Sequence, residues 1–286
     1  MYTEIIYEVQ DPVAVITLNR PESMNAWTNN MDGEIRDAIE RAAADTAVVG
    51  TVITGAGRAF CAGADMKMLS SLSSRGPRES TGDAAAANAA APAEAKPSSD
   101  PWAAADGEFN GRFPYLMMTD KPIIAAINGA VAGMAFPFSL CCDIRVVTPD
   151  AVFLTAFAQR GLIAEWGLSY LLPKLVGPAV ALDLLLTSRK VRGEEAHALG
   201  LANYLVEPDQ LLPFCREYVA KIASACSPSS LAVMKRQVYT QLHVGLGAAE
   251  LESQRLMVES FNRPDFAEGV QSFLQKRSPE FRRLPL

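Results

Sequence analysis

Hydrophobic positions along the chain fall into two alternating patterns. Four short runs rich in β-branched residues end at turn-forming residues, and they span residues 13–19, 48–55, 122–129 and 143–148. Between the first two runs, apolar residues from Met31 to Ala42 recur at the spacing of a helix with one core-facing side. Strands that alternate with helices predict an α/β fold with buried parallel strands.

The pattern changes after about residue 206, where only helical spacing remains. Four helices are predicted, punctuated by Pro228 and Pro264, over residues 211–225, 229–242, 248–261 and 265–276. The chain therefore divides into a core, residues 1–205, and a C-terminal helical region, residues 206–286. A helical tail of this kind is either a lid or an oligomerisation surface.

One segment of the core, residues 72–106, interrupts the alternation. It contains the stretch SSRGPRESTGDAAAANAAAPAEAKPSSDP, with almost no large apolar residue. Such a composition cannot bury enough surface to offset the entropy of ordering. We predict a mobile insertion that would suit a flap over a site. A neutral surface insertion fits the composition equally well.

The composition is that of a globular protein, and it excludes some classes of binding partner. Of 286 residues, 49% are hydrophobic and 20% are charged, with a net charge of -6 and no lysine- or arginine-rich block. Nucleic acid is therefore not expected as a partner. Five cysteines without a CxxC pair and two histidines offer no zinc-ligand set, so no metal is expected. No signal segment or membrane span is present, which predicts a cytoplasmic protein.

Two glycine-containing segments follow predicted strands and carry the candidate chemistry. GRAFCAGADM covers residues 57–66, and INGAVAGM covers residues 127–134. Small residues let a ligand approach the backbone closely. Two such turns could each aim one amide at a single oxygen, which is how an oxyanion hole is built. A plain glycine turn, with Asp65 capping the helix that follows, is the alternative for the first segment.

Several separated motifs resemble one known family. AFCAGADM, KPIIAAINGAVAGM, CDIRV, EEAHALGLANYLVE and DFAEGVQSFLQKRSPEF occur in the order found in the enoyl-CoA hydratase/isomerase (crotonase) superfamily. The resemblance implies a crotonase-like spiral of repeated β-β-α units with a C-terminal helical trimerisation region. It also implies a homotrimer or hexamer, and an acyl-CoA substrate whose thioester enolate is held by two backbone amides. No cofactor is implied beyond the coenzyme A of the substrate.

Carried over by position, the resemblance assigns the two oxyanion amides to Ala64 and Met134. The second of these is glycine in most of the family, so the Met134 side chain must turn away from the site. The residues predicted to contact the acyl group or coenzyme A are Ala62, Asp65, Met66, Phe136, Phe157, Trp166, Phe273 and Lys276. Arg20 is either a further contact to the coenzyme A phosphates or a surface residue at a turn.

The departures from the family pattern concern proton transfer. Hydratases of the family carry two glutamates, and alignment by position puts Pro137 and Phe157 in their places. Neither residue can move a proton. Addition of water to a 2-enoyl thioester needs one group to activate the water and one to protonate the α-carbon. We therefore expect poor hydratase activity.

Glu165, in the stretch RGLIAEWGLSY, is the remaining acidic candidate. It lies where Δ3,Δ2-enoyl-CoA isomerases resemble this sequence and carry their catalytic glutamate. The apolar residues around it are expected to raise its pKa, and they are Leu162, Ile163, Trp166 and Leu168. Capping of the following helix is the alternative role. An isomerase is predicted first. A hydratase or hydrolase that uses Glu165 with a water, and a non-catalytic acyl-CoA-binding protein, are the alternatives.

Three other polar residues are weaker candidates. Asp143 is predicted to be a buried structural carboxylate. His197 and His243 are predicted to lie on helix surfaces.

Overall fold

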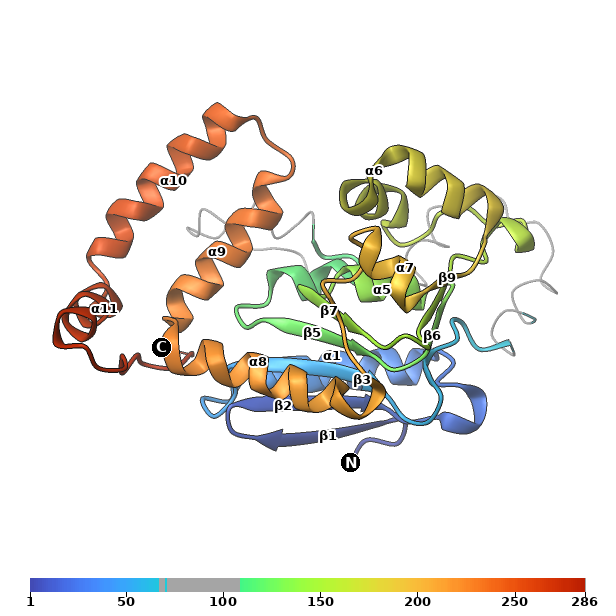
Figure 1. Cartoon of the computed structure of the whole chain (residues 1–286), viewed down its shortest axis with the longest axis horizontal. Helices are drawn as coiled ribbons and strands as arrows, with labels where there is room; N and C mark the ends of the chain where they lie inside the picture. The colour runs from blue at the N-terminus through green and yellow to red at the C-terminus, as the bar shows by residue number, and fades with distance from the viewer. Residues whose placement is uncertain (67–69, 71–108, 286) are drawn as a thin grey trace.

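The computed structural model describes residues 1–66, 70 and 109–285. The predicted insertion at residues 72–106 lies outside these residues. In Figure 1 the described chain forms a layered core, from which the last helices extend to one side.

The larger sheet has six strands in the order β1-β2-β3-β5-β7-β10. Their bounds are Ile5–Gln10 for β1, Val13–Leu18 for β2, Gly50–Gly55 for β3, Ile123–Ile127 for β5, Ile144–Val147 for β7 and Tyr204–Leu205 for β10. From β2 to β10, each strand pairs with its neighbour in parallel, as predicted for β2, β3, β5 and β7, while β10 was not predicted. β1 is antiparallel to β2, because only two residues connect them and so short a connection permits no crossover.

The smaller sheet has four very short strands in the order β4-β6-β8-β9. They span Ala59–Cys61, Ala130–Ala132, Val152–Leu154 and Val191–Arg192. The consecutive pairs β3–β4, β5–β6 and β7–β8 each place their first strand in the larger sheet and their second in the smaller one. This repeat confirms the spiral of β-β units. Its helices are α1 (Asn29–Ala44), α5 (Ala135–Leu140), α6 (Leu168–Thr187) and α7 (Gly193–Ala198).

Helix α1 shows why this segment folds as predicted. The Thr28 side chain accepts a hydrogen bond from the Met31 amide at 3.0 Å, so it caps the helix start. The buried face consists of Met31, Ile35, Ala38, Ile39 and Ala42. Just before the helix, the ring of Trp27 packs against Phe113 and Phe138, with centroid distances of 5.2 and 4.7 Å. These three rings, which we call the aromatic cluster, lie in the main core.

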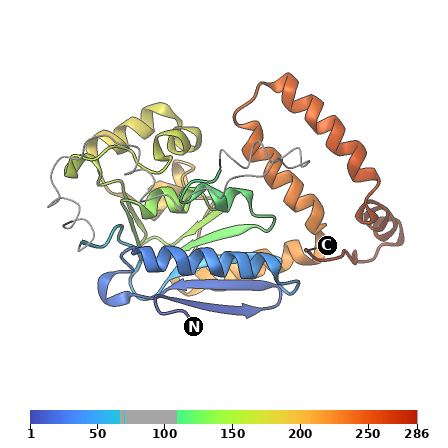
Figure 2. The same cartoon turned by 180° about the vertical axis from the view of Figure 1, so that it is seen from behind.

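The C-terminal helices are α8 (Leu211–Ala225), α9 (Pro228–Gln241), α10 (Leu246–Phe261) and α11 (Pro264–Gln275). The four predicted helices are present, with ends within two residues of the prediction. Pro228 and Pro264 begin helices rather than separate them, since proline fits the first helical turn. α8 packs on the larger sheet, whereas α9, α10 and α11 lead away from it (Figures 1 and 2).

Helix α9 is tied to the core by a partly buried carboxylate. Asp143 accepts hydrogen bonds from the Tyr239 hydroxyl and the Ile123 amide, at 2.8 and 2.6 Å, and pairs with Lys235 at 2.8 Å. The prediction that Asp143 has a structural role is therefore confirmed.

Helix α6 is long and apolar enough to cross a membrane by length and composition alone, the one such helix among the described residues. It is not a continuous helix, because Gly177 has φ 76° and ψ 159° and prolines stand at 173 and 178. Its first part is anchored in the core by Leu168, Leu171 and Leu172.

Candidate active site

The first glycine turn is held on both sides by the backbone of Trp27. The Trp27 amide donates to the Gly63 carbonyl at 2.7 Å, and the Asp65 amide donates to the Trp27 carbonyl at 3.0 Å. In a parallel bridge of this kind, the residue between the two bonded positions turns its own amide away from the partner strand. That residue is Ala64, and no oxygen among the described residues accepts a hydrogen bond from its amide.

The second glycine turn leads into α5. The Gly133 amide donates to the Leu154 carbonyl at 3.0 Å, and Met134 follows as the residue before the helix. Within the described part of the chain, the Met134 amide also has no acceptor. The Met134 side chain is 4% exposed and packs in the core.

The two turns lie directly against each other. A Cβ atom on Gly63, whose φ is 94°, would stand 2.8 Å from the Ala132 carbonyl oxygen and 3.6 Å from the Gly133 Cα. Gly133 also has a positive φ, 52°. Only glycine at position 63 permits this approach, because backbone atoms cannot move aside as a side chain can. The structure therefore brings the Ala64 and Met134 amides onto neighbouring turns.

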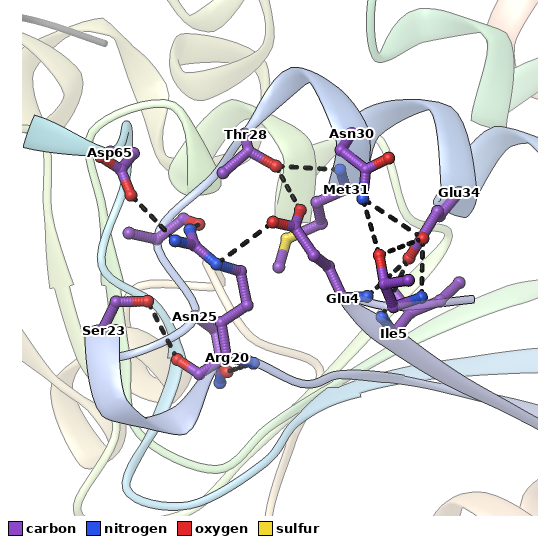
Figure 3. A network of polar contacts seen from close by, with 12 residues as sticks. Glu4, Ile5, Arg20, Ser23, Asn25, Thr28, Asn30, Met31, Glu34 and Asp65 are labelled. Atoms are coloured by element: carbon purple, nitrogen blue, oxygen red, sulfur yellow. Dashed lines mark hydrogen bonds and ion pairs between the residues drawn. The ribbon is translucent and has the colours of Figure 1, made fainter. Parts of the chain in front are cut away.

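Arg20 makes polar contacts that hold the first turn in place (Figure 3). Its guanidinium donates to the Ala26 carbonyl at 2.6 Å and to the Asp65 carboxylate at 3.1 Å. It also pairs with Glu4 at 3.4 Å. Glu4 in turn accepts from the Thr28 hydroxyl. The ion pair between Arg20 and Asp65 thus connects the segment before α1 to the turn of Ala64. Asp65 directly precedes a helical residue, Met66, and its alternative role as a helix cap stays a prediction.

Glu165 lies in the loop before α6, and the next residue, Trp166, contacts the aromatic cluster. The Glu165 carboxylate is half-buried, and burial raises its pKa above the ordinary glutamate value. A hydrogen bond from the Trp166 side chain acts in the other direction and lowers the pKa. The alternative role as a helix cap is wrong, because the N-cap of α6 is Gly167 and no side chain caps it.

The surroundings of Glu165 differ from those predicted. Leu162 and Ile163 are 39% and 79% exposed, so they do not form an apolar wall around the carboxylate. Trp166 provides the apolar contact. Its ring packs on Phe113 of the aromatic cluster, at a centroid distance of 6.0 Å. Sequence spacing alone could not show which of these neighbours turn inward, because the loop has no regular period.

Trp166 has a backbone conformation that large residues rarely adopt. Its φ is 56°, in the left-handed region, which costs a non-glycine residue roughly 1–2 kcal/mol. The Arg112 guanidinium lies over its ring, 5.1 Å from the centroid. Arg112 was not predicted, and no pattern could have found it, since 53 residues separate it from Glu165 and nothing in its local sequence suggests a partner.

The two positions of the missing glutamates are apolar and buried. Pro137 lies within α5, and Phe157 is 5% exposed at the start of a short 3-10 helix, Ala158–Arg160. Phe136 is 1% exposed and packs on Phe153 at 5.3 Å, in the core. Contacts of Phe136 and Phe157 with a substrate remain predictions.

The three predicted catalytic positions border one aromatic cluster. Trp27 holds the turn of Ala64, Phe138 belongs to the helix that follows Met134, and Phe113 packs on the residue next to Glu165. Two amides without acceptors and a half-buried carboxylate on one cluster can stabilise an oxyanion and move a proton. Ala62 and Met66 flank the first turn, and the Met66 side chain is 68% exposed.

Phe273 and Lys276 are not brought to this site within one chain. Both lie at the end of α11, which is at the far side of the molecule from α6 in both views (Figures 1 and 2). The Phe273 side chain is 82% exposed and borders a 490 Å³ cavity between α10, α11 and the C-terminal segment. That cavity is remote from Glu165.

Both histidines are exposed, as predicted, but His243 lies in the turn between α9 and α10 rather than on a helix. His197 is exposed on α7. His243 is exposed beyond α9, where its ring stacks on Tyr170 with a centroid distance of 5.2 Å.

Comparison with known proteins shows the same fold and family. The family model described as enoyl-CoA hydratase/isomerase matches residues 8–88 and 96–283. A "Probable enoyl-CoA hydratase" of Rhodobacter capsulatus is 32% identical over 280 residues, 98% of each chain. A 1,2-epoxyphenylacetyl-CoA isomerase of Escherichia coli is 30% identical over 285 residues, 97% of each chain. An enoyl-CoA hydratase structure from Polaromonas sp. JS666 has a TM-score of 0.83 at 25% identity and covers 97% of this chain and 99% of that one.

The fold and the family match define an enzyme that acts on acyl-CoA compounds. The chain belongs to the enoyl-CoA hydratase/isomerase family, which confirms the resemblance to the crotonase superfamily. Its curated relatives carry both hydratase and isomerase names.

Proposed function

We propose that the protein moves a double bond in an enoyl-CoA from C3 to C2, with Glu165 as the single proton carrier. The observation that carries this proposal is the contrast among three positions. Glu165 is a half-buried carboxylate with a raised pKa, whereas Pro137 and Phe157 are buried and have no proton to exchange. A reaction that needs one base suits this arrangement better than one that needs two.

The reaction proceeds in two proton transfers. The Glu165 carboxylate removes a proton from C2 of the 3-enoyl thioester, and the electron pair moves onto the thioester oxygen. The amides of Ala64 and Met134 donate to this oxyanion. When the carbonyl re-forms, the double bond shifts to C2–C3 and the protonated Glu165 returns the proton at C4. No cofactor is needed beyond the coenzyme A that the substrate carries.

Burial of Glu165 supports the role of base. A carboxylate with a pKa closer to neutrality abstracts a carbon-bound proton more readily than an ordinary glutamate does. A hydrogen bond from Trp166 acts against burial and lowers the pKa of the same carboxyl.

Hydration is the second candidate, favoured by the hydratase names of several relatives. In that case Glu165 would act on a water rather than on C2. The absence of glutamate at positions 137 and 157 predicts that such hydration is slow.

The experiment is a paired turnover assay with 3-enoyl-CoA and 2-enoyl-CoA substrates of several chain lengths. We expect fast isomerisation, slow hydration, and a loss of isomerisation by about 10²–10⁴-fold in Glu165→Gln. Glu194→Gln, which alters an exposed glutamate on α7, is the matched control and should keep full activity. Rapid hydration that depends on Glu165 would establish the second candidate. Binding of both thioesters without turnover would leave a non-catalytic acyl-CoA-binding protein.

We also propose that the chain works as a homotrimer or hexamer in the cytoplasm, without nucleic acid or membrane as partner. The support is the apolar surface of α10 and α11, where the exposed side chains include Leu251, Met257, Val258, Phe261, Val270, Phe273 and Leu274. An assembly would bury these residues and place Phe273 and Lys276 beside a neighbouring chain's coenzyme A. Sedimentation equilibrium of the protein tests this, and a monomer at micromolar concentration would contradict it.

A further inference from the structure

Arg112 is held in a fixed position by the first turn of α1. Its Nε donates to Asp32 Oδ2 at 3.2 Å, and its Nη2 donates to Asn29 Oδ1 at 2.9 Å. The side chain is only 7% exposed. A buried guanidinium keeps its position only if such partners satisfy its donors, since an unpaired buried charge is costly.

The guanidinium makes a third contact besides these two hydrogen bonds. It lies over the Trp166 ring at 5.1 Å, and the next residue, Phe113, packs on the same ring at 6.0 Å. Trp166 is therefore fixed by two consecutive residues of another loop. This explains how a tryptophan keeps a φ of 56°, which the surroundings must enforce.

Trp166 stands between Arg112 and the proposed base. Trp166 directly follows Glu165 in the chain, so fixing this residue also fixes the loop that carries the base. A hydrogen bond from the Trp166 side chain also lowers the pKa of the Glu165 carboxyl. A cation over an indole ring is attracted by the π electrons and draws electron density from the ring N–H, which makes that N–H a better donor. The chain of contacts therefore runs from Asp32 through Arg112 and Trp166 to Glu165.

The same carboxylate reaches the oxyanion side of the site. Asp32 Oδ1 accepts from the Trp27 indole at 3.2 Å, while its Oδ2 holds Arg112. The Trp27 backbone forms the isolated parallel bridge that fixes the turn of Ala64. Asp32 therefore binds both Trp27, which supports the turn of Ala64, and Arg112, which supports Trp166.

We propose that Arg112, oriented by Asp32, is a positioning residue that fixes the direction of the Glu165 carboxylate through Trp166. This inference rests on the proposed role of Glu165 as base. A base must reach both C2 and C4 of one bound substrate, so the carboxylate must be correctly oriented as well as present.

The test compares Arg112→Met and Arg112→Lys with Arg36→Met. Arg36 also lies over an aromatic ring, that of Tyr115 at 3.8 Å, but this ring does not contact Glu165, so it is the matched control. We expect kcat for isomerisation to fall about tenfold in Arg112→Met with little change in KM, because substrate contacts remain while the base is misdirected. Arg112→Lys should recover part of the loss, and Arg36→Met should keep the wild-type kcat.

Two further readouts separate positioning from simple structural damage. The Trp166 hydrogen bond lowers the pKa of Glu165, so loosening it should move the acidic limb of the kcat/KM profile to higher pH in Arg112→Met. Trp166→Phe, which removes the donor, should cause the same shift, and adding Arg112→Met to it should shift the limb no further. Circular dichroism and thermal melting confirm that each variant is folded.

The outcomes distinguish this inference from the proposed function. If Glu165→Gln is inactive but Arg112→Met matches Arg36→Met in kcat and pH profile, the positioning role is refuted and the proposed base stands. If Arg112→Met shifts the acidic limb by the same amount in the wild-type and in the Trp166→Phe background, the route through Trp166 is refuted. If Glu165→Gln retains full isomerase activity, the proposed function itself fails.

Discussion

Arg20 and Arg112 lie at the two sides of the candidate site and support it by different means. Arg20 makes polar contacts to the Ala26 carbonyl, Asp65 and Glu4, and the first two link the segment before α1 to the turn of Ala64. Arg112 combines two polar contacts with a stacked contact to Trp166, and so it acts on a side chain.

The difference follows from the chemistry that each side must perform. An oxyanion amide is part of the main chain, and it is aimed correctly once the turn that carries it is fixed. A catalytic carboxylate sits at the end of a flexible side chain, so fixing its backbone is not enough. The oxyanion side should therefore fail when the backbone is altered, and the base side when a stacking or hydrogen-bonding partner is lost.

The largest expected effect on the oxyanion side comes from Gly63→Ala. The new Cβ would stand 2.8 Å from the Ala132 carbonyl oxygen, which forces the two turns apart. Loss of one oxyanion donor lowers kcat by roughly 10²–10³-fold. Gly177→Ala is the matched control, because Gly177 also has a positive φ, 76°, but no atom within 4 Å of the added Cβ. Steady-state kinetics should show normal kcat in the control, and equal losses in both would refute the account of this turn.

A smaller loss is expected from Arg20→Met. Without its bonds to Ala26 and Asp65, the segment that carries Ala64 loosens, and kcat should fall about tenfold. The acidic limb of the pH profile should stay in place, since Arg20 does not contact the base. This is the opposite of the expectation for Arg112→Met. A shift of the limb in Arg20→Met would erase the distinction between the two arginines.

The pH dependence of kcat/KM in the wild-type protein tests the role of Glu165 as base. Burial holds the pKa of Glu165 above the ordinary value, so kcat/KM should fall as the pH drops through a pKa higher than that of a solvated glutamate. In Trp166→Phe the fall should begin at still higher pH, since the hydrogen bond that lowers the pKa is gone. A profile with no acidic limb down to the pKa of a free carboxyl group would contradict this account.

The smallest expected effect concerns stability. Because the folded-state pKa of Glu165 is raised, its protonated form favours folding, and that contribution is lost as the pH rises through the folded-state pKa. Glu165→Gln stays neutral, so it should be slightly more stable than wild type at neutral pH. The gain should be below about 1 kcal/mol, because the half-exposed carboxylate is screened by solvent. Urea unfolding at pH 7 and at acidic pH measures this, and the difference should vanish at the lower pH.

Much of the fold could be predicted because its strands and helices are long enough to show a period. The parallel strands β2, β3, β5 and β7 and the helices α8 to α11 follow from spacing and from proline positions, whereas the two-residue strand β10 was missed. The smaller sheet could not be predicted, because strands of two or three residues such as Ala59–Cys61 show no alternation. The antiparallel β1 was also missed, since its pairing depends on the two-residue connection.

The candidate site divides in the same way. Ala64, Met134 and Glu165 could be found because they follow local motifs. The support of Trp166 by Arg112, and the exposure of Leu162 and Ile163, could not be found. They depend on contacts between distant segments and on an irregular loop, for which the sequence offers no period.

The central claim is that one carboxylate takes the proton from C2 and returns it at C4. The most direct test is a single turnover of 3-enoyl-CoA that carries deuterium at C2, followed by analysis of the 2-enoyl product. We expect part of the deuterium at C4 with the wild-type protein, and a much slower reaction with Glu165→Gln. A product whose C4 hydrogen comes wholly from water, formed at the same rate by both proteins, would contradict the claim.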